Sequence, residues 1–308
     1  MSWLPTDAPA ESPQTDRAAG DAIELVITSR PRDLGGFSIG RVLPAVQRRL
    51  VGPFIFFDHM IRHDLAPGHG VDVRPHPHIG LATVTYLFEG EIVHRDSLGS
   101  MQPIVPGDVN WMNAGRGIAH SERTGAERRR SGGAMHGIQS WVAFPADAEE
   151  TAPSFEHHAA ATLPLVALPG AKLRVLAGHA YGARSPVGVR SPTLYVHAEV
   201  EAGAQLPITD EHAERAVFVV EGEVGSAERS YGAGSMLVFR NDARTTVHAR
   251  TAARLMLLGG APLEGARHVW WNFVSSSSER IERAKDEWRR GLFAKVPGDE
   301  VEFIPLPE

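Results

Sequence analysis

The sequence predicts an all-β protein with two β-barrels in tandem and one short C-terminal helix. Three observations carry this prediction. The 31 glycines and 22 prolines are spread along the chain and separate short apolar stretches, a pattern typical of sandwiches and barrels. A short sequence pattern occurs once in each half of the chain. One segment near the C-terminus has the apolar spacing of an amphipathic helix.

The apolar stretches between turn residues give the expected strands. They cover residues 23–29, 54–60, 83–88, 91–96, 109–112, 135–144, 174–178, 193–200, 216–220, 235–239 and 254–258. The helix is expected over residues 277–290, with Ser278 as its N-cap. Ile281, Ala284 and Trp288 give it an apolar face, and Gly291 ends it.

A repeated pattern predicts that the two barrels are related copies. The sequence LFEGEI at 87–92 returns as VVEGEV at 219–224, and in each half a later glycine turn leads into an apolar strand. The acidic, proline-flanked stretch 145–153 is the expected junction. We therefore predict a disordered lead-in at 1–21, an N-terminal domain at 22–148 and a C-terminal domain at 149–308.

The bulk properties exclude several classes of protein. The chain has 308 residues, 43% of them hydrophobic and 22% charged, which is ordinary for a soluble globular protein. No apolar run approaches the ~20 residues of a membrane span. A net charge of −6 argues against direct nucleic-acid binding, which normally needs a basic surface. With no cysteine there is no disulfide or thiolate metal site, as expected for a cytoplasmic protein.

Two short triplets carry the strongest chemical signal. One residue separates His76 from His78, and one separates His120 from Glu122. Side chains two positions apart in a strand point to the same face, so two neighbouring strands can direct all four groups at one point. Three imidazoles and a carboxylate suit divalent iron, manganese, nickel, copper or zinc better than calcium or magnesium, which prefer oxygen ligands. Four ligands leave positions open for a substrate or dioxygen.

The second barrel is expected to lack this site. The offset that relates residues 87–92 to residues 219–224 can be applied to the first histidine pair. It places Ile208 at the position of His76 and Asp210 at the position of His78. The alternative is a degenerate second site in the C-terminal half, made of Asp210, His212, Glu214 and His248. Against that alternative, Ile208 replaces a donor and Arg250 would repel a cation.

Other residues near the motifs have less specific interpretations. Three polar residues either orient the imidazoles by accepting a ring N–H or have surface or turn roles: Asp58, His59 and Asn113. His94 and His136 lie on expected strands and are interpreted as structural histidines. The basic run at 128–130 is interpreted as a solvated loop. Four aromatic residues either line a pocket or belong to the core: Trp111, Trp141, Phe54 and Phe56.

The spacing around the first histidine pair resembles the first motif of the cupin superfamily. Gly70 precedes the pair and Gly90 closes the strand pair, as in that motif. The sequence PGD at 106–108, followed by His120, resembles the second cupin motif.

The chain departs from the usual cupin pattern in one respect that narrows the resemblance. The glutamate that normally follows the histidine pair is absent at 82–83, and Glu122 can replace it as the acidic ligand. This substitution resembles the pirin family. Five further segments share that resemblance: RPRDLGG at 30–36, FFDH at 56–59, HRDSLG at 94–99, WMNAGRGIAHSE at 111–122 and WNFVS at 271–275.

The resemblance implies two jelly-roll-like cupin barrels, of which the first binds one Fe(II) through His76, His78, His120 and Glu122. Some bacterial members similar to this chain are quercetin 2,3-dioxygenases, which implies a flavonol and O2 as substrates. In such an enzyme Glu122 also assists removal of the 3-hydroxyl proton. The animal pirin is described as a nuclear co-regulator, so the alternative is a metal-dependent, redox-sensitive regulator acting through a protein partner. A third interpretation is an occupied but idle site.

Overall fold

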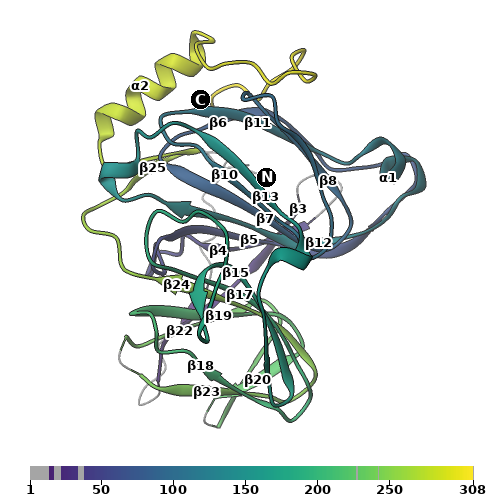
Figure 1. The fold of residues 1–308 in the computed structure, drawn as a ribbon, viewed down its shortest axis with the longest axis vertical. Coiled ribbons are helices and arrows are strands. Elements are labelled where there is room, and N and C mark those ends of the chain that lie inside the picture. The colour runs from purple at the N-terminus through teal and green to yellow at the C-terminus, as the bar shows by residue number, and fades with distance from the viewer. Residues whose placement is uncertain (1–13, 17–21, 34–37, 227, 242, 308) are drawn as a thin grey trace.

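Strands form most of the structure, a computed structural model that describes residues 14–16, 22–33, 38–226, 228–241 and 243–307. Figure 1 shows one barrel above the other, with the longer helix at the end remote from the second barrel. The prediction of an all-β chain with two barrels and a short C-terminal helix is confirmed. Neither helix in the described ranges has the length and apolar character needed to cross a membrane.

Two sheets build the N-terminal barrel. The larger has seven strands in the order β13 (Ser154–His158), β10 (Val109–Asn113), β7 (Leu81–Glu89), β12 (Gly133–Ala143), β5 (Phe54–Leu65), β4 (Ser38–Leu43) and β3 (Arg30–Asp33). The smaller has four, in the order β6 (Asp72–His78), β11 (Ile118–Arg123), β8 (Ile92–Asp96) and β9 (Met101–Ile104). The smaller sheet carries both triplets.

Two further sheets build the C-terminal barrel. The larger runs β1 (Gln14–Asp16), β2 (Ile23–Thr28), β22 (Ser235–Phe239), β19 (Glu214–Glu221), β24 (Ala253–Gly260), β17 (Thr193–Val200), β15 (Ala171–Ala180) and β14 (Leu165–Leu168), with β16 (Ala183–Arg184) paired to β15. The smaller runs β18 (Gln205–Ile208), β23 (Thr245–Ala249), β20 (Glu223–Ser226) and β21 (Arg229–Gly232). Each of the eleven predicted strands coincides with an observed strand.

The helices differ in detail from the sequence predictions. Helix α2 (Ser278–Arg289) is confirmed, but its N-cap is Ser277, whose side chain accepts a hydrogen bond from the backbone N–H of Arg280. The basic run at 128–130 lies in a short helix, α1 (Ala126–Ser131), rather than in a loop. The interpretation failed there because Gly125 and Gly132, which look like loop residues, only flank the helix.

Strand pairing crosses the predicted domain junction in both directions. Strand β2 pairs with β22 of the C-terminal barrel, whereas β13 pairs with β10 of the N-terminal barrel. Strand β1 lies in the segment predicted to be disordered, but its backbone pairs with β2. The rest of that segment, residues 1–13 and 17–21, lies outside the described residues.

The C-terminal segment returns to the N-terminal barrel after the second barrel is complete. A small hairpin, β25 (His268–Trp270) and β26 (Phe273–Ser275), forms a parallel bridge between Phe273 and Ile79, next to the first triplet. The buried carboxylate of Glu149 accepts hydrogen bonds from Ser275 and Ser276 and lies 3.0 Å from Arg267. These contacts fix the C-terminal segment against β6.

The largest apolar cluster lies between the two large sheets. Phe57 and Trp111 come from the N-terminal barrel, and Tyr195 and Phe218 come from the C-terminal barrel. The rings of Phe57 and Phe218 meet edge to face at 5.1 Å. Burying each aromatic side chain of this kind stabilises the fold by roughly 1.5–3 kcal/mol, so this shared core holds the barrels together.

Candidate metal centre

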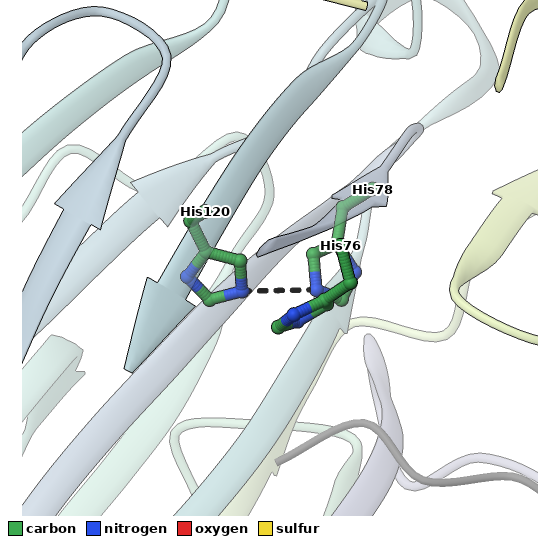
Figure 2. A group of neighbouring side chains, drawn as sticks. All are labelled: His76, His78 and His120. Atoms are coloured by element: carbon green, nitrogen blue, oxygen red, sulfur yellow. Dashed lines mark hydrogen bonds between the residues drawn. The ribbon is translucent and has the colours of Figure 1, made fainter. Parts of the chain in front are cut away.

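Three histidines converge inside the N-terminal barrel. Strands β6 and β11 are antiparallel, and their register places His120 directly opposite His76 and Ile118 opposite His78. One nitrogen of each of His76, His78 and His120 lies within 4.8 Å of the others, and all three side chains are buried. Figure 2 shows the three rings pointing toward one another from two adjacent strands.

The spacing of the nitrogens fits a single ion. His78 Nε2 and His120 Nε2 lie 3.1 Å apart. Two imidazole nitrogens bound side by side at right angles on one metal, each at about 2.1 Å, would be ~3 Å apart. His76 Nε2 is buried and has no hydrogen-bond partner among the described residues. A buried nitrogen without a partner costs free energy, and a metal ligand role accounts for it.

The backbone and a second histidine fix the orientation of two of these rings. His76 Nδ1 lies 2.8 Å from the carbonyl oxygen of Arg74, which can only accept. His120 Nδ1 lies 3.3 Å from Nδ1 of His94, and His94 Nε2 lies 3.1 Å from Oδ2 of Asp96. The ring of His94 also stacks on Phe155 at 4.3 Å. Metal-binding histidines commonly have such outer partners, which set ring orientation.

These contacts select one tautomer for His94 and one for His120. Asp96 Oδ1 already accepts from the backbone N–H groups of Leu98 and Ser100. Its other oxygen therefore accepts from Nε2–H of His94, which leaves Nδ1 of His94 as an acceptor. His120 then donates through Nδ1–H and keeps the lone pair on Nε2 for a metal.

Electrostatics keep the three imidazoles neutral, as metal ligation requires. Burial lowers the pKa of His76, His78 and His120 below the ordinary histidine value. The other imidazoles lower the pKa of His78 and His120 further, because neighbouring positive charges repel. Because the low pKa keeps these nitrogens unprotonated, protons compete less with a metal ion for them.

Glu122 lies close to the histidines in sequence but outside the group whose nitrogens are within 4.8 Å. Between His120 and Glu122 the pairing with β6 shifts by one residue, and the extra residue lies on β6. Side chains along β11 therefore keep their regular alternation between the two faces of the sheet. Glu122 is buried, and its Oε1 lies 2.9 Å from the hydroxyl of Thr85. Its assignment as the fourth ligand stays a prediction.

The residues predicted to orient the imidazoles have other partners. Asp58 forms a buried ion pair with Arg41. His59 on β5 contacts His136 on the neighbouring strand β12, at 2.9 Å between their Nε2 atoms. Asn113 accepts from the indole of Trp111 and donates to Ser154. The orienting residues are instead His94 and Asp96, and the signal that could have found them is their own one-residue spacing on a strand beside β11.

All four aromatic residues are buried in apolar clusters, two of them beside the metal centre. Trp141 lies beside the centre, with its ring 5.3 Å from that of His78, and Phe56 stacks on Trp141 at 4.2 Å. Trp111 and Phe54 belong to the core between the large sheets.

The alternative second site is wrong for the described residues. Asp210 pairs with Arg244, His212 contacts the carbonyl of His179, and Glu214 accepts from the backbone of Gly52. These groups diverge, so the C-terminal barrel does not gather metal donors from them.

Family models match both barrels. The pirin model covers residues 36–142, and the model described as the pirin C-terminal cupin domain covers residues 195–294. The chain belongs to the pirin family. The first match contains the three histidines, so they lie in the N-terminal cupin of a pirin.

Known proteins match nearly the whole chain. A protein of Caulobacter vibrioides named "Pirin-like protein" is 50% identical over 93% of this chain and 100% of its own length. A Pseudomonas aeruginosa protein named "Putative quercetin 2,3-dioxygenase" is 38% identical over 91% of this chain and 90% of its own. The crystal structure of quercetin 2,3-dioxygenase from Acinetobacter baumannii superposes with a TM-score of 0.84 at 32% identity, covering 92% of this chain and 94% of that chain.

Proposed function

We propose that this pirin is a metal-dependent dioxygenase that cleaves quercetin or a related flavonol with O2. The observation that carries the proposal is the convergence of His76, His78 and His120 inside the N-terminal cupin. Relatives that bear the name of quercetin 2,3-dioxygenase, in sequence and in structure, support the substrate class.

The proposed metal is Fe(II), with manganese, nickel, copper and zinc as the other ions that the donors suit. His76, His78 and His120 would hold it, with Glu122 as the fourth ligand. When bound, such an ion supplies a Lewis acid for an anionic oxygen and, for iron, one-electron chemistry toward dioxygen.

Glu122 is the proposed base for the 3-hydroxyl of the flavonol. Its Oε1 and the side-chain oxygen of Gln139 both lie 2.9 Å from the hydroxyl of Thr85, which has only one proton to donate. If the Gln139 amide is turned so that its NH2 donates to Thr85, the Thr85 proton is directed to Glu122. Thr85 would then hold Oε1, and the carboxylate would loosen from the metal to accept the substrate proton.

Aerobic incubation of the iron-loaded protein with quercetin tests this function. The expected result is loss of the flavonol absorption with release of carbon monoxide, both abolished by His78→Ala. Leu165→Ala, an exposed position in the second barrel, is the matched control and should keep full activity. Absence of turnover across several flavonols by protein with a full complement of iron would refute the enzyme.

The alternative function is a redox-sensitive regulator that binds a protein partner. It predicts a partner whose binding differs between the Fe(II) and Fe(III) forms and is lost in His78→Ala, together with no flavonol turnover. Measuring both properties on one preparation separates the two functions.

A further inference from the structure

A cavity of about 500 Å³ lies on the outside of the N-terminal barrel, between α2, the segment that follows it, and strands β6 and β11. Its floor contains Pro75 and Ala119, the residues immediately before His76 and His120. Successive side chains of a strand point to opposite faces. The cavity and the histidine triad therefore occupy opposite faces of the same two strands, and the cavity is a separate site.

Hydrogen bonds hold the walls of this cavity in place. The backbone N–H of Ile304 donates to the carbonyl of Pro75, and the indole N–H of Trp288 donates to the carbonyl of Ile304. The guanidinium of Arg123 binds both oxygens of Asp299, at 2.7 and 2.9 Å, and also donates to Glu302. The C-terminal segment is thus fixed to the strands at several points, so the cavity exists before any ligand binds.

Aromatic and aliphatic side chains form most of the lining. The rings of Phe293 and Phe303 meet the Trp288 ring nearly at right angles, at 5.6 and 5.9 Å. Val296 and Leu306 complete the apolar wall. Phe303 remains 56% exposed. Rings set edge to face leave flat apolar surfaces, which suit a planar aromatic molecule, and the volume lies within the ~300–1,000 Å³ of small-molecule sites.

Two cations at the cavity are available to an anionic group. Two of its three carboxylates, Asp299 and Glu302, are paired with Arg123. Glu300 is the third. Arg289 and Lys295 also line the cavity, and neither has an ion-pair partner among the residues that the structure describes. With Arg123 included, three cations balance the three carboxylates, and an anionic group would pair with Arg289 or Lys295.

We propose that this cavity binds a planar aromatic acid of two or three rings, with its rings against Trp288, Phe293 and Phe303 and its acidic group beside Arg289 or Lys295. The proposal does not depend on the function of the metal centre, because the two sites lie on opposite faces of β6 and β11.

Calorimetric titration of the metal-free protein with 2-naphthoate tests the proposal. We expect one site with a Kd of about 10 µM to 1 mM, the range open to a ligand of this size. The uncharged naphthalene-2-carboxamide should bind several-fold more weakly. Absence of saturable binding up to about 10 mM would overturn the proposal, and equal affinity for the two probes would overturn its charge preference.

Variants locate the site. Ala294→Trp, at an exposed lining position, fills the cavity and should weaken 2-naphthoate binding at least tenfold, and Lys295→Glu should weaken it as well. Arg290→Glu is the matched control: this exposed residue pairs with Asp286 and does not line the cavity, so affinity should stay unchanged. Unchanged affinity in Ala294→Trp, or loss of binding in His78→Ala alone, would assign the ligand elsewhere and refute the proposal.

Discussion

His94 Nδ1 lies 3.3 Å from His120 Nδ1, and the far side of the same His94 ring faces Asp96. Asp96 therefore controls the protonation of Nε2 of His120, a nitrogen of the candidate metal centre that Asp96 does not touch. Because Asp96 accepts a hydrogen bond from Nε2–H of His94, Nδ1 of His94 can accept one from Nδ1–H of His120. With its proton on Nδ1, His120 keeps Nε2 unprotonated.

Asp96→Asn should invert this arrangement. The amide NH2 of asparagine would donate to Nε2 of His94, moving the His94 proton to Nδ1 and forcing the His120 proton onto Nε2. We expect metal affinity to fall about 10–100-fold, as for other outer partners of metal-binding histidines, measured by competition with a chelator. Nitrogen-15 spectra of the metal-free protein should show the changed His120 tautomer.

A pair of substitutions at His94 provides the control. His94→Asn keeps an acceptor oxygen near the position of Nδ1 and should retain most of the metal affinity, whereas His94→Leu should lose it. Equal affinity in the two variants would mean that His94 acts only through packing against Phe155.

Glu122→Gln should separate metal binding from proton transfer. A carboxamide cannot take the 3-hydroxyl proton, so turnover of quercetin at saturating substrate should fall by about 10²-fold or more. Iron content, measured by elemental analysis, should remain substantial because the three histidines are intact. A variant with retained iron and full turnover would show that Glu122 is not the base.

The pair of His59 and His136 should make stability depend on pH. Burial lowers the pKa of His59 to about 3 and that of His136 to about 4, with His136 repelling charge on His59 and Arg254 repelling charge on His136. At pH values between these lowered pKa values and the ordinary 6.5, the two histidines are protonated in the unfolded chain but not in the folded protein. Stability therefore falls as the pH falls through this window.

The size of this effect can be isolated with a double variant. Between pH 7 and pH 5, the pair should account for a loss on the order of 4 kcal/mol in the free energy of unfolding, about 2 kcal/mol for each histidine. Chemical denaturation of metal-free wild type and of His59→Gln/His136→Gln measures it, since the triad contributes equally to both. Parallel pH profiles for the two proteins would contradict the prediction.

Glu149→Ala should destabilise the packing of the C-terminal segment against the N-terminal barrel. It removes a buried carboxylate and leaves Arg267 buried without its charge partner, which costs about 3–5 kcal/mol. Glu150→Ala is the control: Glu150 is 53% exposed and pairs with Arg280, so its loss should cost about 1 kcal/mol or less. Denaturant unfolding checks both, and similar losses would show that burial of Glu149 is not what matters.

The sequence by itself determined the strands and the histidine triad. Alternation along a strand is a local property, so the one-residue spacing of His76 and His78 fixed which face they share before any partner was known. The same rule predicted that His120 would join them once two strands lay side by side.

Only the tertiary structure decided what surrounds the triad. Asp58, His59 and Asn113 were plausible partners by sequence, yet they bind elsewhere, while His94 and Asp96 reach His120 through the pairing of β8 with β11. Strand β2 pairs with β22, β13 pairs with β10, and Phe273 forms a bridge with Ile79. Each of these contacts joins residues far apart in the chain. Such contacts depend on which surfaces bury one another, and local spacing does not encode that choice.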